Sequence, residues 1–178
     1  MEGYNIANTE IKELGFIYSL FDEAISYQKR KEYPVWAGYD KEVLKKDIEN
    51  KLQYKIVIDH NIACIFSICY SDKIIWRDRE KEDTLYLHRI AVNPLYKGQR
   101  QFEKILNWCI DYAIKREFQH IRMDTWADNP SLVNYYKSFG FKIVGSLTTP
   151  NSEELPTPQR NNRVVLLEFS ISNSKPSQ

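Results

Sequence analysis

A basic turn that leads directly into an amphipathic segment is the first feature whose residue types could do chemistry. The segment reads NPLYKGQRQFEKIL, Asn93–Leu106, and it carries Lys97, Gly98 and Arg100 at the junction. A helix N-terminus presents unpaired N–H groups and the positive end of the helix dipole, so a phosphate group binds there readily. The segment therefore predicts an anion site, with the start of an ordinary surface helix as the alternative.

A second chemically promising stretch is DNPSLVNYYKSFGF, which begins at Asp128. Asn129 followed by Pro130 predicts the start of a short helix, because asparagine caps helices and proline suits the first helical position. Tyr136 then falls on the apolar side of this helix. Its phenol is either a buried core group or a proton donor, and the neighbouring Tyr135 is a weaker alternative for the second role.

His88 is a candidate base because it lies in the middle of a predicted strand, in YLHRIAV. An imidazole titrates near neutral pH and can accept a proton through a water molecule. A packed, hydrogen-bonded strand histidine is an equally good interpretation. The other two histidines, His60 in a turn and His120 at a strand start, are expected to be structural.

The elements that must position these residues follow from hydrophobic periodicity and turn signals. Helical spacing predicts helices over Thr9–Arg30, from Asp40 to Leu52, from the basic turn to Arg116, and from Pro130 to Gly140. Apolar runs rich in β-branched residues predict strands over Tyr54–Ile58, Ile62–Tyr70, Thr84–Val92, Gln119–Trp126, Phe141–Leu147 and Arg163–Ile171. This order predicts an α/β fold, in which a mixed sheet is covered by helices in one domain, residues 1–172. Residues 173–178 are expected to form a disordered tail.

Composition excludes several functional classes. The formal net charge is +1 and the isoelectric point is about 7.7, so the basic excess typical of nucleic-acid binders and of polybasic membrane binders is absent. No apolar run is long enough to cross a bilayer, and the opening residues do not resemble a secretory signal. Cys64, Cys69 and Cys109 lack metal-ligand spacing, so we expect reduced cysteines, no metal and a cytoplasmic protein.

The motifs RIAVNPLYKGQ and DNPSLVNYYKSFGF, in this order and spacing, resemble the signatures of the GNAT superfamily, the acetyl-CoA-dependent N-acetyltransferases. The resemblance implies a mostly antiparallel central sheet that is splayed between two strands, with helices on both faces. It also implies that Ile90, Ala91 and Val92 hold the pantetheine arm of acetyl-CoA through freed backbone groups. These groups would polarise the thioester carbonyl, as an oxyanion hole does.

The same resemblance assigns roles to side chains. Asn129 would touch the cofactor, and Tyr136 would protonate the leaving thiolate. His88 lies near the place where the family often has a glutamate base. Acceptor-binding residues of the family lie in loops that correspond here to Trp36, Tyr39 and Trp76.

The expected phosphate cradle departs from the family pattern Gln/Arg-x-x-Gly-x-Gly/Ala, which falls on Lys97, Gly98, Gln99, Arg100, Gln101 and Phe102. Arg100 and Phe102 replace the two signature glycines. Helical φ values at both positions would make these side chains tolerable, whereas positive φ values would favour glycine. The Arg100 guanidinium could then add a charge-assisted contact to phosphate.

The resulting hypothesis is an N-acetyltransferase that moves an acetyl group from acetyl-CoA to a primary amine by direct attack in a ternary complex. The alternative is a catalytically inactive, acyl-CoA-binding sensor or partner module, which the missing glycines favour. The acceptor could be a small molecule or a peptide. An exposed last strand, Arg163–Ile171, could pair with a second copy in a homodimer.

Overall fold

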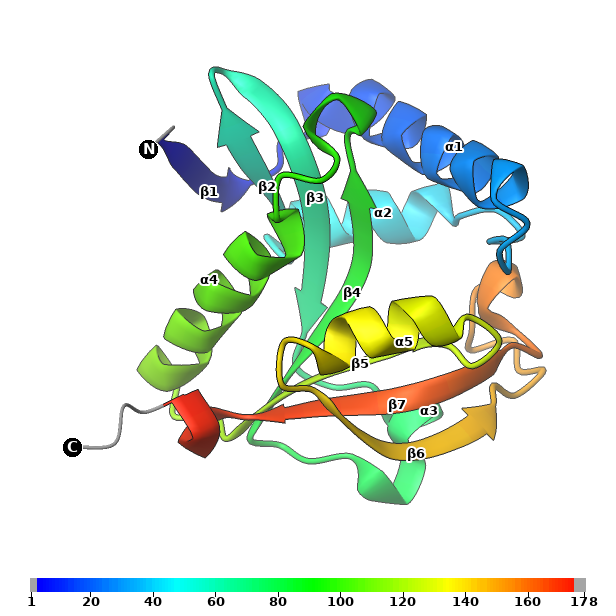
Figure 1. The fold of residues 1–178 in the computed structure, drawn as a ribbon. Helices are drawn as coiled ribbons and strands as arrows, with labels where there is room; N and C mark the ends of the chain where they lie inside the picture. The colour runs from blue at the N-terminus through cyan, green and yellow to red at the C-terminus, as the bar shows by residue number, and fades with distance from the viewer. Residues whose placement is uncertain (1–2, 175–178) are drawn as a thin grey trace. The chain divides into compact units, whose positions relative to one another are not determined.

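The computed structural model describes residues 3–174, and its strands form a seven-stranded mixed sheet (Figure 1). The strand order is β1-β2-β3-β4-β5-β7-β6. The pairs β1–β2, β2–β3, β5–β7 and β6–β7 are antiparallel, and β4–β5 is parallel. The expected α/β fold is therefore confirmed.

The chain forms two compact units, which are described one at a time. Unit 1 comprises Met1–Ile68 and His88–Ile105, and unit 2 comprises Cys69–Leu87 and Leu106–Gln178. Two elements, β4 (Thr84–Val92) and α4 (Gln101–Lys115), pass from one unit into the other along the chain. The prediction of one domain over residues 1–172 stays a prediction.

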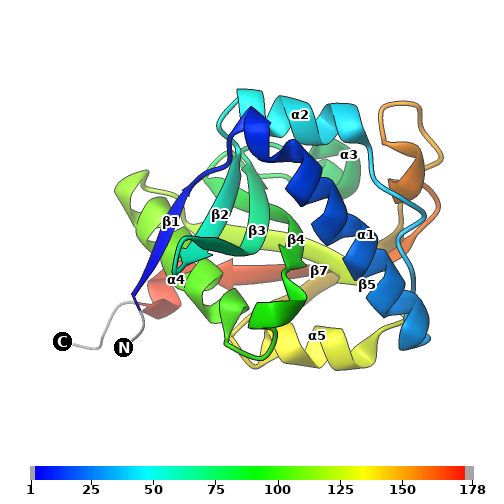
Figure 2. The ribbon, with the colours of Figure 1, turned by 90° about the horizontal axis from the view of Figure 1, so that it is seen from above.

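Unit 1 packs two helices on strands. Helix α1 (Leu14–Arg30) follows a 3-10 turn at Ile11–Glu13, and α2 (Lys41–Glu49) is capped by the Asp40 carboxylate, which accepts from the backbone N–H groups of Glu42 and Val43. Figure 2 shows the two helices from above. Helical spacing places the apolar side chains of each helix on one face. The buried cluster consists of Ile17, Leu20, Phe21, Leu44, Ile48, Ile65 and Ala91.

The strands of unit 1 include one that the sequence did not predict. The hairpin of β2 (Gln53–Ile58) and β3 (Asn61–Cys69) was expected, and the turn residues Asp59 and His60 both have positive φ. Strand β1 (Tyr4–Asn8) was missed. It is short and lies at the sheet edge, where only its first two residues are exposed, and its sequence lacks a run of β-branched residues, so pairing with β2 makes it a strand.

Unit 2 places β7 (Arg163–Ser170) between β5 (His120–Trp126) and β6 (Lys142–Thr148). The expectation that the last strand is free to pair with a second copy is therefore wrong, because β7 is already paired along both edges, with β5 and with β6. The sheet edge in this unit is β6. Helix α5 (Pro130–Lys137) precedes β6 in the chain, as predicted.

The charged connection after β3 contains structure that was not predicted. A short helix α3 (Lys73–Trp76) and a 3-10 turn (Arg77–Arg79) lie there. At the other end, a 3-10 turn, Ile171–Ser174, covers the start of the expected tail. The rest of that tail, residues 175–178, lies outside the described residues.

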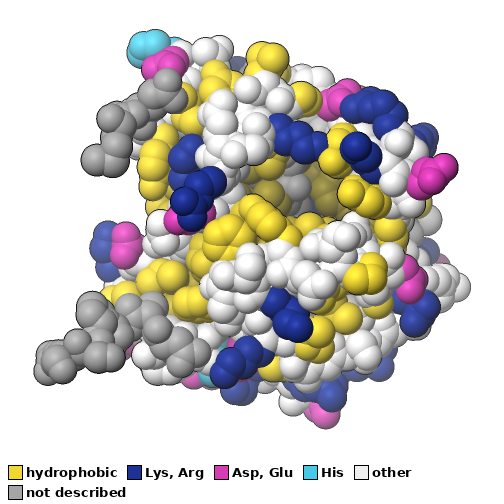
Figure 3. Space-filling view, viewed as in Figure 1, with side chains coloured by type: hydrophobic (Ala, Val, Ile, Leu, Met, Phe, Trp, Pro, Cys, Tyr) yellow, Lys and Arg dark blue, Asp and Glu magenta, His cyan; other side chains and the backbone are white. Residues whose placement is uncertain are grey.

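The surface agrees with the balanced composition. Figure 3 shows Lys and Arg side chains spread over one face of the molecule, with Asp and Glu among them. Between residues 3 and 174, no helix is both long and apolar enough to span a membrane.

Candidate functional site

The predicted phosphate cradle in unit 1 is built on an anchored turn. Strand β4 ends at Val92, and the buried side chain of Asn93 then accepts from the Leu95 N–H at 3.1 Å and donates to the Ile62 carbonyl at 2.8 Å. The Asn93 N–H also donates to the Ala63 carbonyl. The turn is thus fixed to β3 before α4 begins.

Two residues of this turn have left-handed backbone conformations. Gly98 has a φ of 80°, and a Cβ placed on it would meet nothing within 4 Å. Arg100 has a φ of 54°, so the helical φ that would make an arginine tolerable here is not present. The residue immediately before α4 thus has a left-handed conformation, which glycine adopts with less strain than arginine.

The second missing glycine has a different explanation. Phe102 lies inside α4 and is 5% exposed, so its backbone is helical and its ring is packed. The condition under which a side chain is tolerable, a helical φ, is therefore met at Phe102 and not met at Arg100.

Three cationic side chains, those of Lys97, Arg100 and Lys104, lie at the turn. The Lys97 ammonium lies 3.1 Å from the centroid of the Tyr27 ring on α1, and Lys104 donates to the Gln99 carbonyl at 3.1 Å. The exposed Arg100 guanidinium pairs with Glu103, its Nη2 donating at 3.0 Å. Buried Gln101 donates to the Tyr96 carbonyl and braces the turn. Two left-handed residues, Gly98 and Arg100, thus lie just before a helix N-terminus and beside three cations, an arrangement that suits a phosphate.

Two of the three candidate acceptor-binding residues, Trp36 and Tyr39, also lie in unit 1. Trp36 packs on Phe21 with ring centroids 5.7 Å apart, and Tyr39 stacks on Tyr18 at 5.8 Å. The Tyr39 hydroxyl donates to Asp22 at 2.9 Å. Burial, followed by this carboxylate, raises the pKa of Tyr39 to about 12. Sequence reasoning missed Asp22, because its partner Tyr39 is 17 residues away and their contact leaves no local pattern.

Trp76, the third acceptor candidate, lies elsewhere. Its indole is fully buried in the core of unit 2, 5.7 Å from the Tyr86 ring and 4.4 Å from the Arg122 guanidinium. Helix α3 turns this side chain inward, although the charged residues Arg77, Asp78 and Arg79 follow it. We therefore assign Trp76 a packing role and do not retain it as a surface contact for an acceptor.

Unit 2 holds the two residues of the second motif. The Asn129 Oδ1 accepts from the Leu132 N–H at 3.1 Å and caps α5, as predicted. Tyr136 is 9% exposed on the inner side of that helix, with its ring 5.6 Å from the Tyr135 ring. Tyr135 is 43% exposed. The burial of Tyr136 suits both interpretations of this residue.

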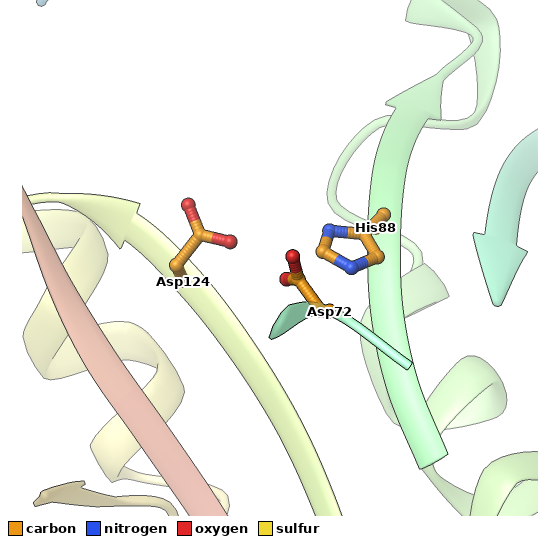
Figure 4. Close-up of side chains that lie close together, drawn as sticks. All are labelled: Asp72, His88 and Asp124. Atoms are coloured by element: carbon orange, nitrogen blue, oxygen red, sulfur yellow. The ribbon is translucent and has the colours of Figure 1, made fainter. Parts of the chain in front are cut away.

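Two carboxylates come together in unit 2 that the sequence did not single out. Asp72 precedes α3 and Asp124 lies on β5, and their oxygens are within 4.8 Å of each other. Both are half-buried. Figure 4 draws these two side chains together with His88, which is half-buried on β4.

The strand β4 carries the remaining candidates. It pairs in parallel with β5 through Thr84–Tyr86 and His120–Arg122. Ile90, Ala91 and Val92 follow in the part of β4 that belongs to unit 1, and Ala91 is packed in the core of that unit. The predicted splay of the sheet beyond Tyr86 stays a prediction.

Comparisons with known proteins bear on these residues. The family model of the acetyltransferase (GNAT) family matches residues 22–141. The uncharacterized N-acetyltransferase YesJ of Bacillus subtilis is 32% identical over 75 residues, which are 42% of each chain. An uncharacterized N-acetyltransferase of Methanocaldococcus jannaschii is 24% identical over 144 residues, 78% of this chain and 61% of that one. Both matches span less than two thirds of the relative's own length.

The fold also matches solved structures. A GNAT-family acetyltransferase from Streptococcus agalactiae superposes with a TM-score of 0.75 at 17% identity, covering 99% of this chain and 98% of that one. At this identity the likeness concerns the fold.

Proposed function

Because the chain belongs to the acetyltransferase (GNAT) family, we propose that it transfers an acetyl group from acetyl-CoA to a primary amine. The amine nitrogen attacks the thioester carbonyl directly, a C–N bond forms and the C–S bond breaks. The amine loses a proton to a base, and the thiolate gains one from an acid. The observation that carries the proposal is the left-handed, cation-flanked turn at the start of α4.

Acetyl-CoA suits this turn because its pyrophosphate needs N–H donors and positive charge in one place. Gly98 leaves open space where a side chain would otherwise obstruct the backbone, and Lys97 and Arg100 are exposed. When bound, acetyl-CoA supplies the activated acyl group. The remaining work falls to side chains and backbone groups of this chain.

The roles of the reacting groups follow the family resemblance. The backbone of Ile90–Val92 stabilises the negative charge that develops on the carbonyl oxygen. The Tyr136 phenol protonates the thiolate, since phenols and thiols have ordinary pKa values that lie within about 2 units of each other. Asn129 caps α5 and touches the cofactor.

We propose His88 as the base that accepts the amine proton through water. Replacement by alanine is expected to lower activity and remove the acidic limb of the pH–rate profile near pH 6–7. An unchanged limb would make His88 a packed strand residue.

The acceptor is a cationic amine in this proposal. Trp36 and Tyr39 offer aromatic faces, and the Asp22 carboxylate lies beside the Tyr39 hydroxyl. Ammonium groups bind to aromatic faces and to carboxylates. The acceptor could be a small molecule or a peptide with such a group. We further propose a cytoplasmic protein that can pair as a homodimer through the edge strand β6.

An acetyl-CoA turnover assay that reads free thiol, run against a panel of amines, tests the proposal. Calorimetry with CoA runs beside it. Turnover with at least one amine is the expected outcome. CoA binding without turnover would favour the inactive acyl-CoA-binding module, and no binding at millimolar CoA would refute both functions.

A further inference from the structure

Arg89 interrupts the regular backbone of β4. Its φ is 52°, and of the residues with positive φ in the described chain it is the one inside a β-strand. A bulky side chain rarely adopts this conformation, because its Cβ crowds the following carbonyl. A left-handed residue within a strand produces a local bend and redirects the groups that follow it, as a β-bulge does.

A buried carboxylate holds the side chain of this residue. Arg89 donates to Asp47 Oδ2 from Nε at 3.0 Å and from Nη2 at 2.7 Å. The side chains of Asp47 and Arg89 are only 11% and 22% exposed. Two charge-assisted hydrogen bonds from a planar guanidinium fix its orientation as well as its distance.

The helix that carries Asp47 is itself well anchored. Leu44 and Ile48 of α2 are 1% and 2% exposed, and both belong to the same buried cluster as Ala91 of β4. Asp40 caps the start of the helix. The carboxylate is therefore attached to a rigid support on which a strained backbone conformation can be maintained.

The bend lies immediately before the backbone that the proposed function uses. We propose that Asp47 is a positioning residue: its pairing with Arg89 holds the left-handed bend that orients the Ile90–Val92 backbone toward the acyl group. This inference rests on the proposed function. A glycine at position 89 would adopt the same φ with less strain, but it would also be free to leave it. An arginine at position 89 can form the ion pair with Asp47, which a glycine cannot.

Four variants separate this role from plain stabilisation. Asp47→Ala removes the carboxylate, Asp47→Asn keeps its volume, and Arg89→Gly permits the bend without the ion pair. The matched control is Lys45→Ala, which removes an exposed ion pair with Glu49 on the same helix.

The first measurement needs no cofactor. In the unliganded protein, the three-bond N–H to Hα coupling of residue 89 reports φ, and amide hydrogen exchange reports the order of Ile90 and Ala91. We expect the coupling in Asp47→Ala to move toward the extended value, exchange at both amides to accelerate, and Lys45→Ala to match wild type. An unchanged coupling in Asp47→Ala overturns the proposal.

The second measurement is the split between kcat and CoA affinity. We expect kcat to fall roughly 10- to 100-fold in Asp47→Ala and Arg89→Gly, the size of effect caused by misplacing a group by about 1 Å. CoA affinity should fall by a smaller factor than kcat, since in the proposed function the phosphates bind at the turn before α4 and only the pantetheine arm uses the Ile90–Val92 backbone. The double variant, Asp47→Ala with Arg89→Gly, should have a kcat no lower than that of either single variant. A full kcat in the folded variants contradicts the positioning role.

The two measurements also separate failure of the proposal from failure of the proposed function. If wild type neither binds CoA nor turns over, the proposed function fails, while the coupling of residue 89 still decides whether Asp47 holds the bend. If Asp47→Ala does not fold, both measurements are made on Asp47→Asn and Arg89→Gly instead.

Discussion

The replacement of two family glycines by Arg100 and Phe102 had two different physical consequences. Phe102 lies within a helix, where a side chain has no backbone cost and can pack. Arg100 kept the left-handed φ of a glycine and therefore carries strain. A left-handed non-glycine residue costs roughly 1–2 kcal/mol of folding free energy. The arginine side chain either offsets this cost by binding a ligand or lowers stability without a gain.

Replacing Arg100 with glycine separates stability from binding. We expect Arg100→Gly to raise the free energy of unfolding by about 1 kcal/mol, because relief of strain exceeds the loss of one exposed ion pair and the entropy cost of glycine. Arg100→Ala is the matched control, since it loses the same pair but keeps the strain. Urea denaturation of both variants checks the difference.

The same substitution should weaken CoA binding. A guanidinium beside the pyrophosphate contributes about 1–3 kcal/mol as a charge-assisted contact, and the loss should shrink as salt screens the charges. Glu103→Gln releases Arg100 from its present partner and should strengthen binding. Tighter binding by Arg100→Gly would show that the arginine obstructs the cradle.

Tyr136→Phe tests the proposed acid. Turnover should fall roughly 10²-fold, the size expected for losing a general acid, while CoA affinity and stability stay near wild type because the ring is kept. Tyr135→Phe, on the same helix but 43% exposed, should keep full turnover. Equal rates for Tyr136→Phe and wild type would assign the phenol to the core.

At the scale of elements, the turn of the β2–β3 hairpin has a backbone conformation that favours glycine, but the sequence places His60 there. Ile58 pairs with Asn61, so the loop has two residues, and Asp59 and His60 have φ values of 47° and 66°. Positive φ at both central residues is typical of a turn that prefers Asn-Gly or Asp-Gly. His60→Gly should therefore raise the free energy of unfolding by about 1 kcal/mol relative to His60→Ala. Thermal unfolding of the two variants measures this, and equal midpoints would refute the turn assignment.

At the scale of the whole molecule, His120 links stability to pH. Its side chain lies between Lys81, at 3.3 Å, and Glu168, at 3.6 Å. Burial lowers the pKa of His120 below its ordinary value of 6.5. As pH falls through 6.5, His120 becomes protonated in the unfolded chain while it is still neutral in the folded chain. The free energy of unfolding therefore falls.

His120→Gln should flatten this dependence. We expect the free energy of unfolding of wild type to drop more between about pH 8 and about pH 5.5 than that of the variant, since this interval covers the ordinary titration of histidine. A parallel loss of stability in wild type and His120→Gln would contradict the assignment. Denaturant titrations at both pH values provide the comparison.

Sequence alone determined the elements whose signals lie within a few residues of one another. Strand β4 has the predicted bounds, Thr84–Val92, and α5 begins at the predicted cap Asn129. These predictions succeeded because caps, turns and hydrophobic periodicity act locally. The two motifs, in their order and spacing, also identified the family.

Only the tertiary structure decided features that depend on distant partners. Asp47 and Arg89 are 42 residues apart, so their pairing leaves no local pattern. Strand β1 becomes a strand by pairing with β2. Trp76 is buried by a short helix that lies within a charged connection. The left-handed φ of Arg100 and Arg89 belongs to the same class. A backbone conformation that a residue disfavours is imposed by the surrounding fold, and the residue's own preference predicts the opposite.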